Sequence, residues 1–282
     1  MTSRSVLDPL WLAATFPEVH NLEPVALGGQ RWVYRGDHDD EGQVVVKIVK
    51  PGQDPERIRR EISAVTAIHS SRVPVIHATG VAQSNVGPCV WVREGWIPGT
   101  NLAVLLEAGA IGEADLLRLA HDLLTALHEA EVVRIVHRDV KPGNILRGES
   151  GAFWLLDFGL ARNLDLDSIT PTAAQFGVGT FGYSAPEQMR NLKPKIDSRS
   201  DLFAAGVTLY EAATGINPFR QGARDHLEIL RRTERLPLQR LRLLFKGGDV
   251  LADLVSAMTQ KYPDQRPRTI AAALQWLAEI PS

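Results

Sequence analysis

Hydrophobic and polar positions along the chain follow two different periods, one typical of strands and one typical of helices. A β-branched run at 44–49 and an apolar run at 89–92 predict strands, and a strand, a turn and a second strand are predicted over 25–34. Leucine and alanine recur every three or four residues between 116 and 127, which predicts a long helix with one buried side. Further elements are expected as helices at 55–65, 197–211 and across most of 225–280, a short N-terminal helix beginning at Asp8 and Pro9, and a hairpin joining 145–146 to 154–156.

Composition narrows the class of protein without naming a function. The 282 residues suffice for two compact lobes or one large domain, and 44% hydrophobic with 23% charged residues is typical of a soluble globular protein. With 31 basic and 33 acidic residues, the net charge of −2 gives no sign of a nucleic-acid or membrane partner. The single cysteine, Cys89, cannot form an internal disulfide, so we expect a buried thiol and a reducing, cytoplasmic location. No apolar run approaches the roughly 20 residues that span a bilayer, so we expect no membrane segment in this chain, which could still be one domain of a longer protein.

Two short motifs concentrate the chemistry. The first, HRDVKPGN at 137–144, contains Asp139, Lys141 and Asn144, and the second, DFG at 157–159, adds Asp157. Transfer of a phosphoryl group requires a carboxylate near the attacking hydroxyl and oxygen ligands for magnesium. Asp139 can supply the first, Asn144 and Asp157 can supply the second, and Lys141 can neutralise charge on the transferred group.

This pair of motifs resembles the protein kinase family, specifically the eukaryotic-like serine/threonine kinases of bacteria, over roughly residues 22–280. The resemblance implies an α+β, two-lobed fold. Residues 1–96 would form a small antiparallel-sheet lobe with one main helix, an N-terminal helical extension and the hinge. Residues 97–282 would form a larger, mostly helical lobe with the catalytic and activation loops. The implied activity is transfer of the ATP γ-phosphate, with Mg²⁺, to serine or threonine hydroxyls of a protein substrate; the oligomeric state stays open.

The resemblance assigns a role to each residue of the two motifs. Asp139 would orient the substrate hydroxyl and accept its proton, and Lys141 would steady the γ-phosphate. Asn144 and Asp157 would hold magnesium. Lys141 favours serine/threonine over tyrosine specificity. His137 is expected to pack against the DFG turn rather than act as a base.

A lysine and two glycines in the early strands would bind the nucleotide phosphates. Lys47 interrupts the apolar run 44–49, where an unpaired charge would be costly to bury, and Glu61 on the predicted helix 55–65 is the expected partner. Gly28 and Gly29 would form the phosphate-binding turn. Only one of the family's three glycine positions, Gly28, is kept.

The stretch from Glu94 to Trp96 resembles the hinge, whose backbone groups would pair with adenine. In that alignment Arg93 takes a position at the back of the adenine pocket that is usually apolar or small.

Other residues are expected to support or regulate the catalytic loop. By resemblance, Asp201 would fix its backbone, and Glu187 and Arg266 would form a buried ion pair. Thr170 and Thr172 in the activation loop are expected to be autophosphorylated, and Arg138 is expected to bind the resulting phosphate group. The Thr180 hydroxyl is expected to contact Asp139 and Lys141 instead.

Two other classes of function are compatible with parts of this pattern. A pseudokinase acting as a nucleotide-binding scaffold would explain the missing glycines and Arg93, but it would not need the intact charged groups. A small-molecule phosphotransferase of the aminoglycoside-kinase kind would share the two motifs, but Lys141 and the APE segment at 185–187 argue against it.

Overall fold

The structure, a computed structural model, describes residues 7–27, 31–50, 66–85, 87–158 and 179–280. The chain divides into two compact units, one formed by 1–69 with 74–97 and the other by 70–73 with 98–282. The expected boundary fell after residue 96, and the structure places it after 97. Residues 70–73 join the second unit because Arg72 bonds there: its Nε donates to Asp122 at 2.7 Å, and its carbonyl accepts from the N–H of Leu155 at 2.9 Å.

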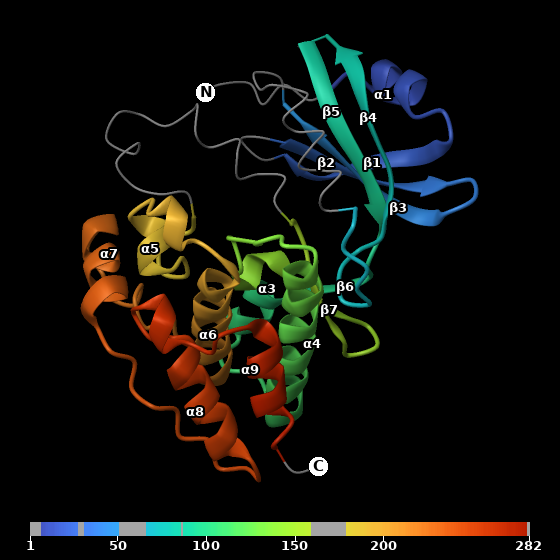
Figure 1. The fold of residues 1–282 in the computed structure, drawn as a ribbon. Helices are drawn as coiled ribbons and strands as arrows, with labels where there is room; N and C mark the ends of the chain where they lie inside the picture. Colours follow the sequence, from blue (N-terminus) through green and yellow to red (C-terminus); the bar gives the residue numbers. More distant parts are fainter. Residues whose placement is uncertain (1–6, 28–30, 51–65, 86, 159–178, 281–282) are drawn as a thin grey trace. The chain divides into compact units, whose positions relative to one another are not determined.

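The first unit is built on an antiparallel sheet with the strand order β1-β2-β3-β5-β4 (Figure 1). The strands are β1 (Val19–Leu27), β2 (Arg31–His38), β3 (Gly42–Val49), β4 (Ile76–Ser84) and β5 (Gly87–Gly95). β1 begins earlier than its apolar pattern predicted, and β4 was not predicted, because its residues alternate between half-buried and exposed without a β-branched run.

The register between β3 and β5 decides which side chains share a face of this sheet. Lys47 lies opposite Val92, and Val45 lies opposite Glu94. Directly opposed residues of an antiparallel pair point to the same face, and the face alternates with every residue. Lys47 and Glu94 therefore share one face, and Arg93, opposite Val46, lies on the other.

Helix α1 (Pro9–Thr15) covers the face that carries Val46. The Asp8 carboxylate accepts from the N–H of Leu10 at 2.9 Å, and Pro9 occupies the first turn, so the predicted helix start is confirmed. Leu12 and Phe16 pack into the core of the sheet together with Cys89, which is fully buried as expected. The helix thus closes the hydrophobic core of the first unit.

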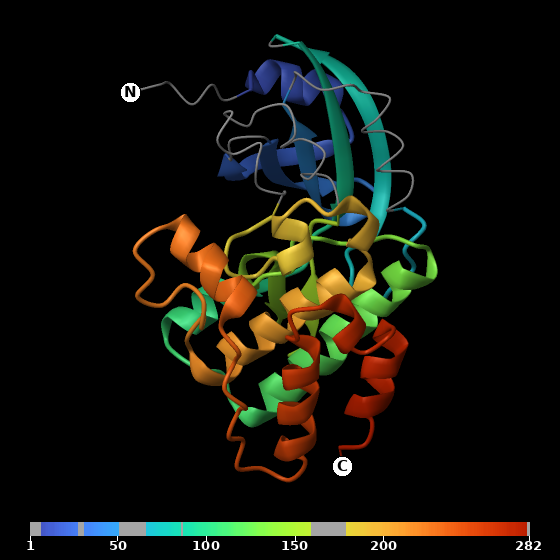
Figure 2. The same cartoon turned by 60° about the vertical axis from the view of Figure 1, so that its left-hand side comes forward.

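The second unit is mainly helical. Its helices are α3 (Leu102–Glu107), α4 (Glu113–Val132), α5 (Pro186–Met189), α6 (Ser198–Thr214), α7 (His226–Arg235), α8 (Gly248–Met258) and α9 (Ile270–Leu277). A small sheet is formed by β6 (Gly99–Asn101), β7 (Ile145–Gly148) and β8 (Phe153–Leu155), which includes the predicted hairpin. Helix α4 packs against α6 and α9, and α6 packs against α8 (Figure 2). Helix α7 ends before Leu236, because Pro237 disfavours helical backbone at the residue before it, and the following residues 236–247 are not helical.

Helix α6 is the most enclosed of these elements. Residues 200–209 are buried without interruption, including Asp201, whose side chain carries a charge. A helix that is apolar on all sides belongs in the core. In the part of the chain that the structure describes, no helix is both long and apolar enough to cross a membrane.

The Lys261 ammonium lies against the aromatic core beside α6, with its nitrogen 4.4 Å from the centre of the Phe219 ring. Among the described residues its Nζ is buried without a hydrogen-bond partner. Burial, together with the nearby Arg266 charge, lowers the pKa of Lys261 from 10.5 to about 8. The Phe219 ring offsets part of this cost by attracting the cation.

We expect Lys261→Met to stabilise the protein at pH 7 and to lose that advantage as the pH rises. Between pH 8 and 10.5 the unfolded chain holds more protons at residue 261 than the folded one, so the free energy of unfolding of the natural protein rises across this window. Urea unfolding of both proteins at pH 7 and pH 10 measures the difference, and other titrating groups cancel in the comparison. An equal difference at the two pH values would contradict the burial of a charged ammonium.

Candidate active site

The catalytic loop between α4 and β7 is held by one buried carboxylate. The backbone N–H groups of His137 and Arg138 donate to the two carboxylate oxygens of Asp201, each at 2.6 Å. Asp201 is buried in the first turn of α6. The expected role of Asp201 is therefore confirmed. Arg138 has a φ of 61°, a left-handed conformation that costs free energy for a residue other than glycine, and the two hydrogen bonds to Asp201 hold the backbone there.

Three side chains surround the Asp139 carboxylate. The Thr180 hydroxyl donates to Oδ1 at 2.7 Å, Lys141 Nζ lies 2.8 Å from Oδ2, and the Asn144 amide nitrogen donates to Oδ2 at 3.0 Å. Lys141 also donates to the Thr180 hydroxyl at 2.8 Å, which confirms both contacts expected of Thr180. These donors favour the ionised carboxylate and fix its orientation. The three contacts hold the carboxylate of Asp139 in one orientation within the catalytic loop.

The hairpin β7–β8 brings the two expected magnesium ligands to neighbouring positions. The N–H of Leu156 donates to the Asn144 carbonyl at 2.8 Å, and Asp157 follows directly with a φ of 65°. The Asn144 amide nitrogen is turned to Asp139, which leaves its amide oxygen for a cation. One carboxylate and one amide oxygen suit magnesium, which keeps several waters and takes phosphate oxygens as further ligands.

His137 packs against the residue that follows Asp157, as predicted. Its ring lies 4.5 Å from the Phe158 ring in an edge-on arrangement. Nδ1 accepts from the N–H of Asp139 at 3.2 Å, so Nε2 carries the proton and donates to the Leu156 carbonyl at 2.9 Å. With both nitrogens engaged by backbone, His137 joins the two motifs and is not placed to act as a base.

The segment that follows Thr180 is anchored by a buried ion pair. The Arg266 guanidinium binds the Glu187 carboxylate through two nitrogens, at 2.7 and 3.0 Å, and the Ser200 hydroxyl donates to the same carboxylate at 2.7 Å. The side chains of Arg266 and Glu187 are 0% and 2% exposed. The predicted ion pair is therefore confirmed.

Gln188 is a supporting residue that the sequence analysis missed. Its amide nitrogen donates to the Arg138 carbonyl at 2.8 Å. Both the N–H and the carbonyl of Arg138 are therefore hydrogen-bonded, the N–H to Asp201 and the carbonyl to Gln188. The only signal in the sequence was its place directly after the APE segment. Beside this loop lies a cavity of about 360 Å³, whose polar lining includes Lys141, Thr180, Glu211 and Arg220.

In the first unit, Lys47 contacts an acidic residue that the sequence analysis did not name as its partner, while the expected partner Glu61 lies outside the described residues. Its ammonium contacts the Glu94 carboxylate, and both side chains are about nine-tenths buried. The N–H groups of Gly95 and Trp96 donate to the carbonyls of Val75 and Gln43, each at 3.0 Å. A pairing of these two groups with adenine would first require them to leave those acceptors.

Arg93 is not at the back of an adenine pocket, and that expectation is wrong. It points to the opposite face of the sheet, where Nη1 binds Glu18 at 2.7 Å and Nε and Nη2 bind Glu41 at 2.8 and 2.9 Å. The guanidinium lowers the pKa of Glu41. The alignment was offset by one residue, and in a strand one residue exchanges the two faces. Glu94, not Arg93, shares the face of Lys47.

Five of the predicted site residues lie outside the described residues. They are Gly28, Gly29, Glu61, Thr170 and Thr172. Their roles stay predictions.

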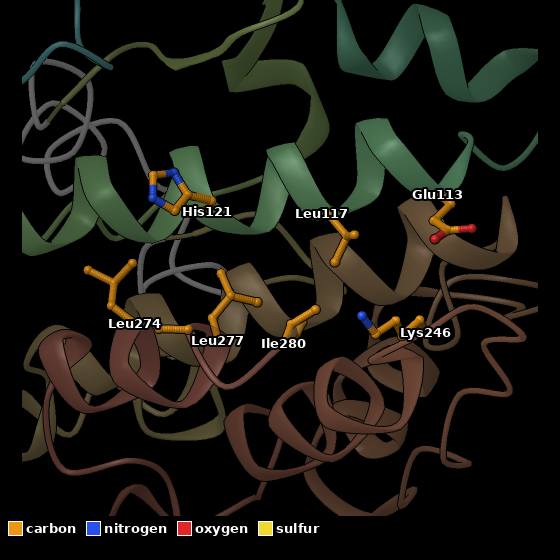
Figure 3. A pocket seen from close by; sticks show the side chains of 8 residues that line it. Glu113, Leu117, His121, Lys246, Leu274, Leu277 and Ile280 are labelled. Carbon is orange, nitrogen blue, oxygen red and sulfur yellow. The ribbon is translucent and has the colours of Figure 1, made fainter. Parts of the chain in front are cut away.

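A second cavity, of about 550 Å³, lies between α4 and the end of α9 (Figure 3). Its lining is largely apolar, with Leu117 from α4 and Leu274, Leu277 and Ile280 from the α9 segment. Its charged side chains, such as Glu113 and Lys246, form no cluster around a common point in this view. Because no group here resembles the Asp139 arrangement, we place the chemistry of this unit at the catalytic loop.

The comparison with known proteins agrees with this geometry. The chain matches the protein kinase domain over residues 20–277 and therefore belongs to the protein kinase family. It is 36% identical over 169 residues to the probable serine/threonine-protein kinase PknB of Bifidobacterium longum, a match that covers 58% of this chain and 24% of that protein. It is also 33% identical over 183 residues to serine/threonine-protein kinase PknB of Mycobacterium leprae, covering 62% and 29% of the two chains. The chain thus spans less than a third of the length of these relatives.

Proposed function

We propose that the chain is an ATP- and Mg²⁺-dependent protein serine/threonine kinase domain. The observation that carries the proposal is the set of contacts around Asp139, in which Lys141, Asn144 and a threonine hydroxyl all donate to one carboxylate. The names of these relatives, which are serine/threonine-protein kinases, support the substrate class. A protein carrying serine or threonine acceptors is the proposed partner.

Each group near Asp139 has a distinct task in the proposed reaction. Asp139 accepts the proton of the acceptor hydroxyl as that oxygen attacks the γ-phosphorus and the bond to the β-phosphate oxygen breaks. The Thr180 hydroxyl occupies Oδ1 of Asp139 at hydrogen-bond distance, which is the position that an acceptor serine or threonine hydroxyl would take. Lys141 bridges Asp139 and Thr180 and supplies positive charge for the transferred phosphate.

Asn144 and Asp157 are the residues that would hold magnesium, which neutralises the charge of the nucleotide phosphates when bound. Lys47 would bind the α- and β-phosphates. Lys47 comes from strand β3, whereas the residues that would hold magnesium and those that would handle the acceptor come from the two motifs at 137–144 and 157–159.

The two alternatives are not favoured. A pseudokinase scaffold has no need for a carboxylate held by three donors. Arg93 no longer supports this alternative, because its side chain lies on the face of the sheet opposite to Lys47. A small-molecule phosphotransferase is opposed by the contacts of Lys141 and by the anchored segment at Glu187.

A cytoplasmic location is supported by the buried thiol of Cys89, whose pKa is raised by burial, and by the need for ATP.

The test is to incubate the purified protein with labelled ATP, Mg²⁺ and a generic protein substrate, and to map phosphorylated residues by mass spectrometry. We expect label on serine and threonine, dependent on Mg²⁺. A parallel assay with aminoglycosides separates the small-molecule alternative. Nucleotide binding without any transfer would favour the scaffold.

We further expect phosphorylation of Thr170 and Thr172 in trans, and reduced activity of the Thr170→Ala/Thr172→Ala variant towards a protein substrate. Arg138 is exposed on a backbone that Asp201 and Gln188 hold in place, so its guanidinium is ready to bind a phosphate. A phosphothreonine there can form one to three charge-assisted hydrogen bonds.

The interaction with Arg138 has its own control. In an Arg138→Gln background the two threonine substitutions should lower the activity towards a protein substrate only slightly further. Arg134→Gln alters another exposed arginine near the loop, and in that background the threonine substitutions should lower the activity as much as in the natural protein. Full activity of the double threonine variant, with no phosphate at either site, would remove this role.

A further inference from the structure

Lys47 lies on an inner strand among apolar neighbours. Its strand β3 has β2 on one side and β5 on the other, and the side chains of Val45, Val46 and Ile48 beside it are buried. Only 6% of Lys47 is exposed. Burying an ammonium without a negative or hydrogen-bonding partner costs free energy, whether or not a nucleotide is present.

Glu94 provides such a partner from within the same sheet. The β3–β5 ladder sets Val45 opposite Glu94 and Lys47 opposite Val92, which places Lys47 and Glu94 diagonally on one face. Long side chains reach each other across this diagonal. The contact between Lys47 Nζ and Glu94 Oε1 is therefore fixed by backbone hydrogen bonds on both strands.

This arrangement has a consequence for a flexible side chain. Lysine has four rotatable bonds, and ordering them costs up to about 2 kcal/mol of conformational entropy. A carboxylate held on the neighbouring strand orders the lysine before the phosphates arrive, so less of that cost falls on nucleotide binding. Glu94 has the chemistry and the placement for this task.

We infer that Glu94 is a positioning residue that holds Lys47 for the nucleotide phosphates through its side chain, in addition to any partner that the helix predicted at 55–65 provides. The inference rests on the proposed nucleotide role of Lys47. It assigns to the Glu94 carboxylate a function that differs from an adenine contact through its backbone.

The opposite face of the same strand supplies a matched control. Arg93 binds Glu18 and Glu41 there, and the side chain of Glu18 is 39% exposed. Glu18→Gln removes a carboxylate that binds a neighbouring residue of β5 but leaves the Lys47 face unchanged. Any general effect of weakening an ion pair on β5 should therefore appear in both variants, and an effect on Lys47 only in the Glu94 variant.

The experiment measures Mg-ATP binding by titration calorimetry, which does not depend on phosphoryl transfer. We expect Glu94→Gln to raise the Kd about tenfold, the scale of one charge-assisted hydrogen bond, with a higher KM for ATP and an unchanged KM for the protein substrate. Glu94→Asp keeps the charge on a shorter side chain, so its Kd for Mg-ATP should lie between those of the natural protein and Glu94→Gln. Glu18→Gln should bind ATP as the natural protein does. Thermal unfolding confirms that each variant is folded.

A double-mutant cycle with Lys47→Ala decides the assignment. Glu94→Gln should have no further effect on ATP binding once Lys47 is replaced, because residues that act as a unit are non-additive. A parallel cycle with Glu61→Ala measures the coupling that the sequence predicts. Additive losses for Lys47 and Glu94, or tighter ATP binding by Glu94→Gln, would overturn the inference, the latter because Glu94 would then compete with the phosphates. Natural protein that binds ATP but transfers no phosphate would instead refute the proposed function.

Discussion

Asp139→Asn is expected to fold normally and bind Mg-ATP with unchanged affinity, but to transfer phosphate about 10²-fold more slowly or worse. The substitution keeps the shape of the side chain while removing the group that accepts the hydroxyl proton. It also places an amide where Thr180, Lys141 and Asn144 now donate to a carboxylate, so at least one of these donors would meet an N–H instead of an oxygen. Single-turnover measurement of phosphoryl transfer at saturating ATP isolates the chemical step.

Asp264→Asn serves as the matched control for this experiment. Asp264 is exposed, lies in the same unit and is remote in sequence from both motifs, so the same chemical change there should leave the rate unchanged. Natural transfer rates in Asp139→Asn would exclude Asp139 as the proton acceptor.

Arg266→Met is expected to lower the free energy of unfolding by about 3–5 kcal/mol, because it leaves the buried Glu187 carboxylate without its cation. The lost guanidinium also donates to the carbonyls of Arg199, Gln260 and Lys261. A typical domain has a total stability of about 5–15 kcal/mol, so the variant should unfold at much lower urea concentration. Equilibrium urea unfolding measures the change.

Two comparisons test the cause of that loss. Replacing both partners, as Glu187→Met/Arg266→Met, should recover part of the stability, because no uncompensated charge remains. Arg240→Met breaks the surface pairs of Arg240 with Asp249 and Asp253 and should shift the unfolding curve far less. If Arg266→Met and Arg240→Met shift the curve alike, burial does not govern the Glu187 pair.

Much of the second unit could be predicted from the sequence, because its motifs combine a local pattern with a chemical requirement. The apolar residues of α4 recur with the helical period, which predicts a helix with one buried side. The positions of Asp201, Thr180 and His137 followed from the catalytic-loop motif, since each bonds to a residue within it. The buried charge of Arg266 likewise required a partner that the sequence could name.

The parts that could not be predicted depend on register and on backbone conformation. The sequence around Arg93 and Glu94 does not determine which of these two side chains lies on the same face of the sheet as Lys47, because a shift of one residue exchanges the faces of a strand. The left-handed conformation of Arg138 is held by hydrogen bonds from the distant residues Asp201 and Gln188, which its own sequence neighbours do not reveal. Strand β4 was missed because its half-buried pattern carries little signal.

The two bonds from the catalytic loop to Asp201 tie an irregular segment to the most enclosed helix of its unit. A buried helix opens only in large, cooperative unfolding events, whereas an ordinary surface loop samples many conformations in the native state. The backbone of residues 137 and 138 should therefore behave as part of α6: it is intact whenever the helix is intact. Any switch between active and inactive forms of this unit would then have to act on groups that contact the loop through their side chains, as Thr180 does. The backbone of the loop itself would keep the same conformation in both forms.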